Sequence, residues 1–385
     1  MNIVLLPAPS YIGGVTTHVF MLSKGLRELG HKVFLIQGTP PTWFRVPFIR
    51  LPEIIIGQFN LYFSRRYRRW SEDFYFLADT MWKTKGNIAV LNIQNVQHIG
   101  MAKLLQRLTG CKLALTVHGY LTYEAETGNW CKIGDATHKW LWSVEKSGYD
   151  RFDSIVCVAR RTVTHVEKFT SKNIHLIPNG LDTDVFKPTA EIDSVQGSPR
   201  TMLFAGAIQE AKGIMDVLKV LRLLVGNKRP ALLLRVAGTG PQEPEARQFV
   251  RDNGLEQNVE FLGLVNREKM VDFYQSGSIL LFPSKQAGLS GKAEESSPYS
   301  VLEALACGVP VVAYRTGGLH EQVRDGVNGY LVEPGDLDAF AACAATLIDN
   351  AELLKQMGAA ARLHCVQDFS HIIMARRYVK VYECG

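Results

Sequence analysis

The sequence predicts an α/β protein built from two doubly wound parallel sheets in tandem. The chain has 385 residues, more than one hydrophobic core usually supports. Short apolar runs alternate with helical patterns in both halves, which favours parallel strands covered by helices. A polar stretch with Gly, Ser and Pro at 186–200 separates the two series and is typical of a linker.

The first half contains six apolar runs with the length and the bounds of strands. One lies in IHLIPNGLDTDVFKP (174–188), before the turn at Asn179-Gly180, and the others are 3–6, 32–36, 89–93, 112–117 and 154–158. Helical spacing separates these runs at 18–29, 98–108 and 159–169. The alternation predicts the first sheet.

The second half repeats the alternation. Its predicted strands are 201–204, 231–236, 259–262, 278–282 and 309–313. Its predicted helices are 213–225, 243–253, 267–275, 299–306, 337–348 and 351–366. Because such sheets bind ligands beyond the carboxyl ends of their strands, we expect the site in a cleft where the two domains face each other.

Composition favours a water-soluble globular protein. The hydrophobic fraction of 46% is ordinary for that class, and no apolar run approaches the roughly 20 residues of a membrane span. The N-terminus has no basic lead and is expected to be a strand rather than a signal peptide. The cysteines are odd in number, scattered and without C-x-x-C spacing, so we expect reduced thiols in the cytoplasm, with neither a zinc site nor a disulfide framework.

Positive charge is concentrated in the first half. Residues 1–190 carry 23 Lys and Arg against 14 Asp and Glu, whereas the remainder is slightly acidic. The first half is therefore expected to attract anions. Anionic lipid, a phosphorylated substrate and nucleic acid are the partner classes, and a solvated basic surface is the alternative.

The strongest chemical signal is EESSPYSVLEALACGVPVVA (294–313). Ser297-Pro298 predicts a helix start, with the serine as N-cap and the proline at the first helical position. Free N–H groups at a helix start suit a phosphate. Glu295 and Glu303 flank that start and could accept hydrogen bonds from hydroxyl pairs, which together outline a nucleotide sugar. The alternative is a capped surface helix with two solvated glutamates.

Weaker signals follow other strands. In MLFAGAIQEAKGI, the strand ends at Gly206 and Lys212 precedes a helix, where a lysine could reach a diphosphate or simply be solvated. In VAGTGPQ, Gly238 permits close ligand approach or a tight turn. In TVHGY, His118 follows a strand and could bind a sugar hydroxyl or be structural. Gly13-Gly14 after the first strand could admit a phosphate or make a turn.

Taken together, these motifs resemble the retaining nucleotide-sugar glycosyltransferases of family 4, which have the GT-B architecture of two Rossmann-like domains. The resemblance covers nearly the whole chain, from GGVTTH through TVHG, IPNGLDTDVF, FAGAIQEAKG and VAGTGP to ESSPYSVLEALACGVPVVA. It implies an acceptor-side domain at 1–188 and a donor-binding domain at 200–368. A C-terminal helix at 369–385 would cross back onto the first domain.

The resemblance also implies roles for individual residues. Glu303 would hold the donor ribose, Glu295 the hydroxyls of the donor sugar, and Lys212 the diphosphate. His118 would lie beside the transferred sugar, so that His118, Glu295 and Lys212 are the candidate catalytic residues. The other candidate donor contacts are Gly14, Gly206, Gly238, Tyr299, Ser300 and Val301, the last three through their backbone. No metal and no cofactor is expected beyond the nucleotide diphosphate sugar, which is the donor substrate.

Three features depart from the family pattern. Ala207 stands where a basic residue often follows the glycine of the phosphate loop. Pro298 stands where a Phe-Gly pair commonly follows the first glutamate, and it removes one backbone donor. Residues 285–294 lengthen the loop before Glu295 and are expected to form either a mobile lid or an inert surface insertion.

The implied activity is retaining transfer of a hexose-type sugar to a hydroxyl acceptor. The acceptor is expected to be a glycan or a lipid-linked molecule of a microbial cell surface. A nucleotide-sugar epimerase and a non-catalytic GT-B-like protein are the alternatives. A dinucleotide dehydrogenase is disfavoured, because the G-x-G-x-x-G fingerprint is incomplete.

A basic aromatic stretch remains outside these motifs, TWFRVPFIRLPEIIIGQFNLYFSRRYRRW (42–70). Six arginines alternate with aromatic side chains, which favours contact with an anionic membrane surface. An ordinary helix pair with a solvated basic face is the alternative. Nucleic acid is disfavoured, because no nucleic-acid motif accompanies the stretch. The protein would then be cytoplasmic and peripheral on the inner face of the membrane.

Overall fold

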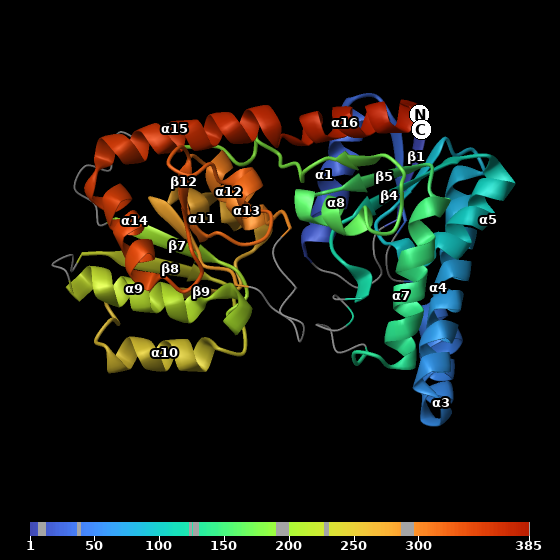
Figure 1. Cartoon of the computed structure of the whole chain (residues 1–385), viewed down its shortest axis with the longest axis horizontal. Helices are drawn as coiled ribbons and strands as arrows, with labels where there is room; N and C mark the ends of the chain where they lie inside the picture. The colour runs from blue at the N-terminus through green and yellow to red at the C-terminus, as the bar shows by residue number, and fades with distance from the viewer. Residues whose placement is uncertain are drawn as a thin grey trace. The chain divides into compact units, whose positions relative to one another are not determined.

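The computed structural model describes residues 1–6, 13–36, 40–122, 125, 131–189, 200–226, 231–285 and 296–384. The chain divides into two compact units. Unit 1 contains the described residues of Met1–Gly180 together with helix α16 (His371–Cys384), and unit 2 contains those from Leu181 to Ser370. Each unit has one six-stranded sheet whose paired strands all run parallel (Figure 1). The predicted fold class is confirmed.

The sheet of unit 1 has the strand order β2-β1-β3-β4-β5-β6. Its strands are β1 (Asn2–Leu6), β2 (Lys32–Leu35), β3 (Val90–Ile93), β4 (Lys112–Val117), β5 (Ser154–Cys157) and β6 (Ile174–Leu176). Its helices are α1 (Gly14–Glu28), α2 (Thr42–Arg45), α3 (Leu51–Phe59), α4 (Leu61–Thr84), α5 (Ile99–Thr109), α7 (Ala136–Gly148), α8 (Arg160–Val166) and α16.

The sheet of unit 2 has the order β12-β11-β10-β7-β8-β9. Its strands are β7 (Thr201–Ala205), β8 (Leu233–Ala237), β9 (Val259–Gly263), β10 (Ile279–Phe282), β11 (Val311–Tyr314) and β12 (Gly329–Val332). Its helices are α9 (Ile214–Gly226), α10 (Glu243–Asp252), α11 (Met270–Gln275), α12 (Tyr299–Ala306), α13 (Leu319–Gln322), α14 (Leu337–Asp349) and α15 (Ala351–Asp368).

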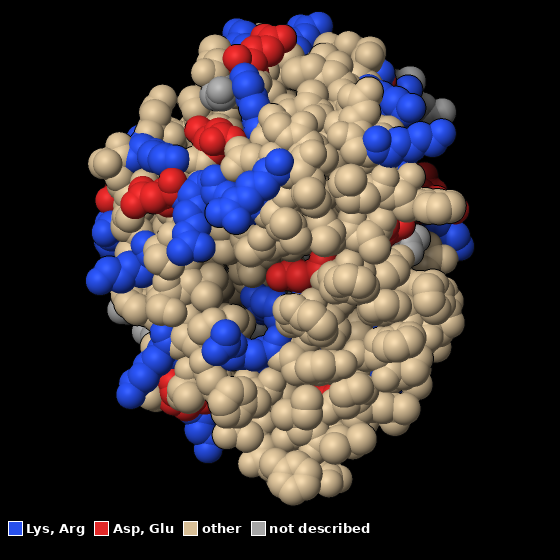
Figure 2. All heavy atoms as spheres, turned by 90° about the vertical axis from the view of Figure 1, so that its right-hand side faces the viewer, with Lys and Arg blue, Asp and Glu red and all other residues tan. Residues whose placement is uncertain are grey.

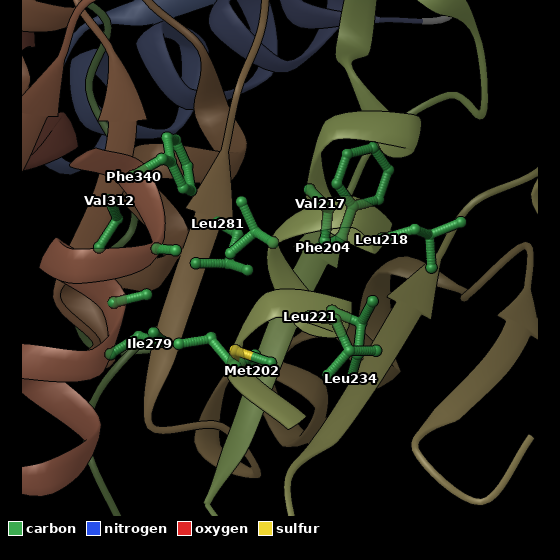
Figure 3. Close-up of a cluster of buried hydrophobic side chains, with 14 of the residues drawn as sticks. Met202, Phe204, Val217, Leu218, Leu221, Leu234, Ile279, Leu281, Val312 and Phe340 are labelled. Atoms are coloured by element: carbon green, nitrogen blue, oxygen red, sulfur yellow. The ribbon is translucent and has the colours of Figure 1, made fainter. Parts of the chain in front are cut away.

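The central strands are apolar on both faces because helices cover both faces of a parallel sheet. All four residues of β10 and of β11 are buried. Figure 3 shows how their side chains meet those of β7, β8, α9 and α14 in the core of unit 2. A separate cluster fills unit 1, where β1, β3, β4 and β5 pack against α5 and α7.

In each sheet the strand order reverses once: the chain first adds strands on one side of the first strand and then on its other side. We call the place between the two sides the reversal point. In unit 1, β2 lies on one side of β1 and β3 on the other. In unit 2, β8 lies on one side of β7 and β10 on the other. The loops that leave two such neighbouring strands diverge to opposite faces of the sheet, which leaves a crevice beyond their carboxyl ends. The two reversal points are therefore where each unit is built to bind a ligand.

Helices α7 and α13 and strand β12 are among the elements that were not predicted. Helix α7 lies in the segment between two predicted strands, and β12 is a four-residue edge strand. The start of β12 depends on its neighbour, since a Cβ atom at Gly329 would lie 2.1 Å from the carbonyl oxygen of Val311. None of the helices in the described parts of the chain combines the length and the apolar character needed to cross a bilayer.

Helix α16 packs within unit 1 against α1 through a glycine. A Cβ atom at Gly25 would lie 2.6 Å from the carbonyl oxygen of His371 and 2.8 Å from the Cβ of Ala375. The two helix backbones therefore approach too closely for any side chain at this position. The same helix buries Tyr378 and Tyr382 against the sheet of unit 1.

We expect Gly25→Ala to lower the free energy of unfolding of unit 1 by about 1–3 kcal/mol, because the added methyl group must push α16 away from α1. Urea denaturation followed by circular dichroism measures the change. Gly100→Ala in α5 is the matched control, since its Cβ atom would meet nothing within 4 Å. That control should be neutral or stabilising, as alanine is the better helix former. Equal stability of the two variants would show that the contact is not tight.

Candidate functional site

The site residues of unit 2 lie on the loops at its reversal point. The loop after β7 contains Gly206 and Lys212, the loop after β8 contains Gly238, and α12 follows β10 along the chain. Because β10, β7 and β8 are adjacent and parallel, their carboxyl ends lie at one edge of the sheet. The structure thus gathers these predicted donor contacts at that edge.

Glycines allow the first two loops to touch. A Cβ atom at Gly238, where φ is +144°, would lie 1.9 Å from the carbonyl oxygen of Gly206. Gly240 packs in the same way, with 2.3 Å from its Cβ position to the carbonyl oxygen of Ile208. The backbone N–H of Ile208 donates to the carbonyl of Thr239 at 2.9 Å. Gly238 is therefore needed for backbone packing, whatever its role towards a ligand.

Lys212 is half-buried and its side chain lies over Gly206. Its Cγ atom is 3.9 Å from the position that a Cβ atom would take at Gly206. A backbone hydrogen bond joins this loop to the segment after β10, since the N–H of Lys285 donates to the carbonyl of Ala211 at 2.8 Å. Ala207 is exposed, so this loop presents one cationic side chain where the family pattern often has two.

Helix α12 spans the predicted residues, but its N-cap differs from the prediction. It starts at Tyr299, with Pro298 rather than Ser297 at the N-cap, and the predicted serine cap is wrong. The Ser297 hydroxyl instead accepts a hydrogen bond from Gln322 Nε2 at 2.9 Å. The backbone N–H of Leu302 donates to the Pro298 carbonyl and makes the first regular hydrogen bond of the helix. The amides before Leu302 therefore have no carbonyl partner within the helix.

These amides belong to Tyr299, Ser300 and Val301, and none has an intrahelical partner among the described residues. Tyr299 and Val301 are buried, whereas Ser300 is half-buried. A row of amides at a helix start favours an anion. The arrangement is compatible with the predicted backbone contacts to phosphate, which remain a prediction.

Glu303 is half-buried on the second turn of α12. Tyr274 of α11 donates a hydrogen bond from its hydroxyl to Glu303 Oε2 at 2.9 Å. Burial raises the pKa of Glu303 to about 7, although the Tyr274 hydrogen bond and the charge of Arg267 oppose the shift. Tyr274 occupies one carboxylate oxygen, which leaves the other available to hydroxyl donors.

One turn earlier, Tyr299 places a buried hydroxyl on the same helix. Within the described parts of the chain this hydroxyl has no hydrogen-bond partner. Burial raises the pKa of Tyr299 well above its usual range, so the group stays a neutral donor. A buried unpaired hydroxyl is costly unless a ligand or water completes it.

Other predictions fall outside the described residues. Glu295 and most of the predicted lid, residues 286–294, lie there, and so does most of the linker. The role of Glu295 therefore stays a prediction. Among the described residues, no cluster of three or more His, Cys, Asp or Glu side chains could hold a metal ion.

In unit 1, a pocket of about 210 Å³ lies at the other reversal point. The loop after β1 lines it with Gly13 and Gly14, the loop after β3 with Gln94, and the end of β4 with His118. Gly14 and His118, which lie far apart in the sequence, are thus brought together. The volume is smaller than the several hundred Å³ of a typical ligand site, so it fits a part of a ligand.

A directed chain of hydrogen bonds orients His118. Its Nε2–H donates to Gln94 Oε1 at 2.9 Å, and Gln94 Nε2 donates to Asn92 Oδ1 at 3.0 Å. Asn92 Nδ2 in turn donates to the hydroxyl of Tyr382 on α16. The hydroxyl of Thr116 also donates to Asn92 Oδ1, at 3.1 Å. The chain leaves Nδ1 of His118 as the acceptor nitrogen.

His118 is also held in the neutral form. Burial lowers its pKa well below the usual range, and the neighbouring ring of His18 adds to the effect. The two rings make an edge contact with 4.7 Å between centroids. His18 Nδ1 is hydrogen-bonded to Asn179 Oδ1 at 2.9 Å, and burial lowers its pKa to about 4. A neutral His118 can accept a hydrogen bond from a hydroxyl without adding a charge to the pocket.

Sequence reasoning missed the residues that position these groups. Gln94 directly follows a buried strand, as His118 does. The criterion that selected His118, a polar residue at the end of a predicted strand, could therefore have selected Gln94 as well. Tyr274 lies in a predicted helix, and no local pattern indicates that it faces Glu303. His18 and Asn179 lie within quoted motifs, but only the tertiary fold pairs them.

The raised pKa of Glu303 predicts a dependence of stability on pH. The folded protein binds this proton more tightly than the unfolded chain, whose glutamate pKa is 4.5. The free energy of unfolding should therefore fall as the pH rises from about 4.5 to about 7. We expect Glu303→Gln to remove this contribution in calorimetric melts of the ligand-free protein. The control Glu352→Gln, on the exposed face of α15, should keep the wild-type profile; identical profiles for both variants would contradict the shift.

The hydrogen-bond chain predicts the tautomer of His118. Nitrogen-15 NMR of labelled histidine should show neutral His118 protonated at Nε2 at about pH 7, because Gln94 Oε1 can only accept. Gln94→Met removes that acceptor and should give a mixture of the two tautomers. A wild-type spectrum with the proton on Nδ1 would mean that the amide of Gln94 is reversed. His175, on the edge strand β6, provides an internal reference signal.

Comparison with known families covers both halves of the chain. The model for glycosyltransferase family 4 matches residues 12–185, and the model for glycosyl transferases group 1 matches residues 189–364. The first match contains the pocket of Gly14 and His118. The second contains the loops of Gly206 and Gly238 and the whole of α12. The two matches together span nearly the whole chain.

Individual relatives agree with the families. The chain is 25% identical to N-acetyl-alpha-D-glucosaminyl L-malate synthase of Bacillus anthracis, over 96% of this chain and 94% of that protein. It is 26% identical to the MMP alpha-(1->4)-mannosyltransferase of Mycolicibacterium hassiacum, over 100% and 98%. The crystal structure of Anabaena Alr3699/HepE in complex with UDP has a TM-score of 0.73 at 16% identity and full coverage of both chains, and it shares the two-domain GT-B fold. The chain is therefore a glycosyltransferase of the family 4 type, in which a family 4 domain is followed by a group 1 domain.

Proposed function

We propose that this glycosyltransferase moves a hexose-type sugar from a nucleotide diphosphate sugar to a hydroxyl acceptor, with retention at the anomeric carbon. The observation that carries the proposal is the reversal point of unit 2. There, the first three amides of α12, which have no intrahelical partner among the described residues, and the half-buried Glu303 follow β10, the neighbour of the strand that precedes Lys212. Amides and a lysine suit a diphosphate, and a carboxylate suits the hydroxyls of a ribose.

Related proteins support the donor class. Alr3699/HepE was crystallised with UDP and also with UDP-glucose. The names of the relatives mention glucosaminyl and mannosyl transfer. We propose a glycan or lipid-linked acceptor, because one relative is named as a mannosyltransferase that acts on an acylated phosphatidylinositol mannoside. A microbial cell-surface product would follow.

The proposed mechanism relies on electrostatics and positioning. When the glycosidic bond to the diphosphate breaks, positive charge develops on the anomeric carbon and negative charge on the leaving oxygen. Lys212 and the amides of α12 stabilise the negative charge, while Glu303 holds the ribose. The acceptor hydroxyl attacks from the same face, and its proton passes to the leaving phosphate oxygen, so no side-chain base is required. We propose that no metal takes part.

In unit 1, His118 would accept a hydrogen bond from a hydroxyl of the transferred sugar through Nδ1. Gly14, without a side chain, would let the donor approach the start of α1. The proposed role of Glu295 is to bind donor-sugar hydroxyls. All seven cysteines are free thiols, which supports a cytoplasmic site of action.

The proposed function is tested with a panel of nucleotide sugars. A donor should raise the melting temperature, since it binds only the folded protein, and should release its nucleotide faster when an acceptor is added. We expect Lys212→Ala to lower turnover by about 10²–10³-fold, the loss typical of one oxyanion-stabilising group. Nucleotide release is followed in a coupled assay.

Lys355→Ala, an exposed lysine of α15, is the matched control and should keep wild-type turnover. Conversion of the donor sugar without an acceptor would indicate an epimerase instead. Binding without any turnover, across donors and acceptors, would indicate a non-catalytic protein. Wild-type turnover of Lys212→Ala would remove the proposed role of that lysine.

A further inference from the structure

The crossover from β2 to β3 carries a helical hairpin that the sheet does not need. Its second helix, α4, covers the sheet with its C-terminal half, where Phe76, Thr80 and Thr84 are buried. The first helix, α3, buries none of its nine residues. Before it, α2 and the π-helical turn Val46–Arg50 bury only Ile49. The core of unit 1 therefore does not explain the apolar sequence of this hairpin.

The amphipathicity of α3 is inverted relative to a water-soluble helix pair. Its exposed residues recur at helical spacing and are Leu51, Ile54, Ile55, Gln58 and Phe59. Four of these five are apolar, with exposed fractions from 52 to 85%. In a helix pair in water, such a stripe is expected to face the partner helix. Here it faces away from α4.

The less exposed face of α3 carries Glu53 and Gly57 together with Pro52 and Ile56, and polar contacts join it to α4. Ser64 of α4 donates its hydroxyl hydrogen to the carbonyl of Glu53 at 2.7 Å. Gly57 faces the same serine, since its Cβ position lies 3.4 Å from Ser64 Oγ. Glu53 also pairs with Arg68 at 3.6 Å. The hairpin is thus held together by polar contacts, which leaves its aliphatic side chains for another surface.

The stripe continues into neighbouring exposed aromatic residues. Before α3 these are Trp43 and Phe48, and at the start of α4 Phe63 follows, each more than half exposed. Figure 2 views the side of unit 1 that carries α3 and α4, and charged side chains are sparse over the lower right part of this face. An apolar surface of this extent marks an interaction site.

Charge identifies the kind of partner. The only acidic residue of 42–70 is Glu53, which is turned inward against Arg68. Among the described residues, neither Arg45 nor Arg50 has an acidic partner within salt-bridge distance. Two arginines of the stretch 42–70 are engaged elsewhere: Arg68 pairs with Glu53 and Glu72, and half-buried Arg69 donates to Gln97. Among the described residues, unpaired positive charge therefore lies beside the apolar stripe at Arg45 and Arg50, and also at the start of α4, where Arg65 and Arg66 have no salt-bridge partner.

We infer that α3 and the turn before it form a docking surface for an anionic lipid bilayer, with the stripe in the headgroup boundary and Arg45 and Arg50 on lipid phosphates. At 1.5 Å per residue, nine residues are far too short to cross a hydrocarbon core of about 30 Å, so α3 lies in the interface. A symmetric second copy would bring like charges together. The inference extends the proposed function, because it gives an anionic membrane surface as the place where the transferase acts. Membrane binding can be tested without a sugar donor.

Cosedimentation with vesicles tests the inference on the full chain. Wild-type protein should bind vesicles of phosphatidylcholine with about 30% phosphatidylglycerol more tightly than vesicles of phosphatidylcholine alone. Arg45→Gln with Arg50→Gln should weaken binding to the anionic vesicles by about 30-fold, since each basic residue near such a surface contributes about a factor of five. Ile54→Ser, Ile55→Ser and Phe59→Ser together should weaken binding to both vesicle types by about tenfold or more.

Matched controls lie on exposed parts of the same unit. Leu104→Ser with Leu108→Ser on α5, and Arg107→Gln with Arg376→Gln, should leave vesicle binding unchanged. All variants should keep the wild-type melting temperature, because the replaced side chains are exposed. They should also keep wild-type transfer to a water-soluble acceptor, which separates this test from the proposed function.

Two outcomes would overturn the inference. One is equal vesicle binding by the wild type and the two hairpin variants. The other is absence of vesicle binding together with a wild-type dimer in ultracentrifugation that the serine variant abolishes, which would make a second copy the occupant. Loss of sugar transfer by the wild type with vesicle binding retained would refute the proposed function alone.

Discussion

Parallel alignment of the strands is the constraint on which both candidate sites depend. Every paired strand in the two sheets runs in the same direction, so each sheet has one edge at which all carboxyl ends emerge. The reversal of strand order then opens a crevice at β1/β3 in unit 1 and at β7/β10 in unit 2. Glycines let the loops meet there, and the backbone contact between Gly238 and Gly206 would exclude any larger residue. The positions of the candidate site residues therefore depend first on the course of the backbone and only then on the side chains.

At both sites burial shifts the pKa of a polar side chain towards its uncharged form, and a neighbour orients that side chain. Burial holds His118 neutral, and Gln94 fixes its tautomer through a chain of bonds that ends on Tyr382 of α16. Burial likewise favours the protonated form of Glu303, while Tyr274 holds one of its oxygens. Such groups cost stability, because a charge is disfavoured and a hydrogen bond is incomplete until a ligand arrives. The cost is consistent with sites that are arranged for a partner, since packing alone would not select these residues.

The sequence predicted most of the fold, because buried parallel strands are continuous apolar runs and their helices have clear spacing. It located α12 from residue 299, yet it placed the cap on Ser297, since it could not show that Gln322 engages that hydroxyl. Glycine and lysine motifs at strand ends placed Gly206, Lys212, Gly14 and His118 at the reversal points. Tyr274, His18 and Asn179 could not be found, because each acts through a contact between residues far apart in the chain. β12 was missed for the same reason: its start depends on close approach to Val311.

The helical hairpin of α3 and α4 shows what the spacing of apolar residues in a sequence cannot predict. An apolar stripe at helical spacing predicts a buried face, yet periodicity does not state which surface will bury it. In α4 the stripe through Phe76 meets the sheet, whereas in α3 the stripe through Ile54, Ile55 and Phe59 meets solvent. The polar contacts of Ser64 and Glu53 fix the observed orientation, because turning the aliphatic side chains inward would move Glu53 away from both Ser64 and Arg68. The hairpin is thus a fold element whose apolar face is completed outside its own unit.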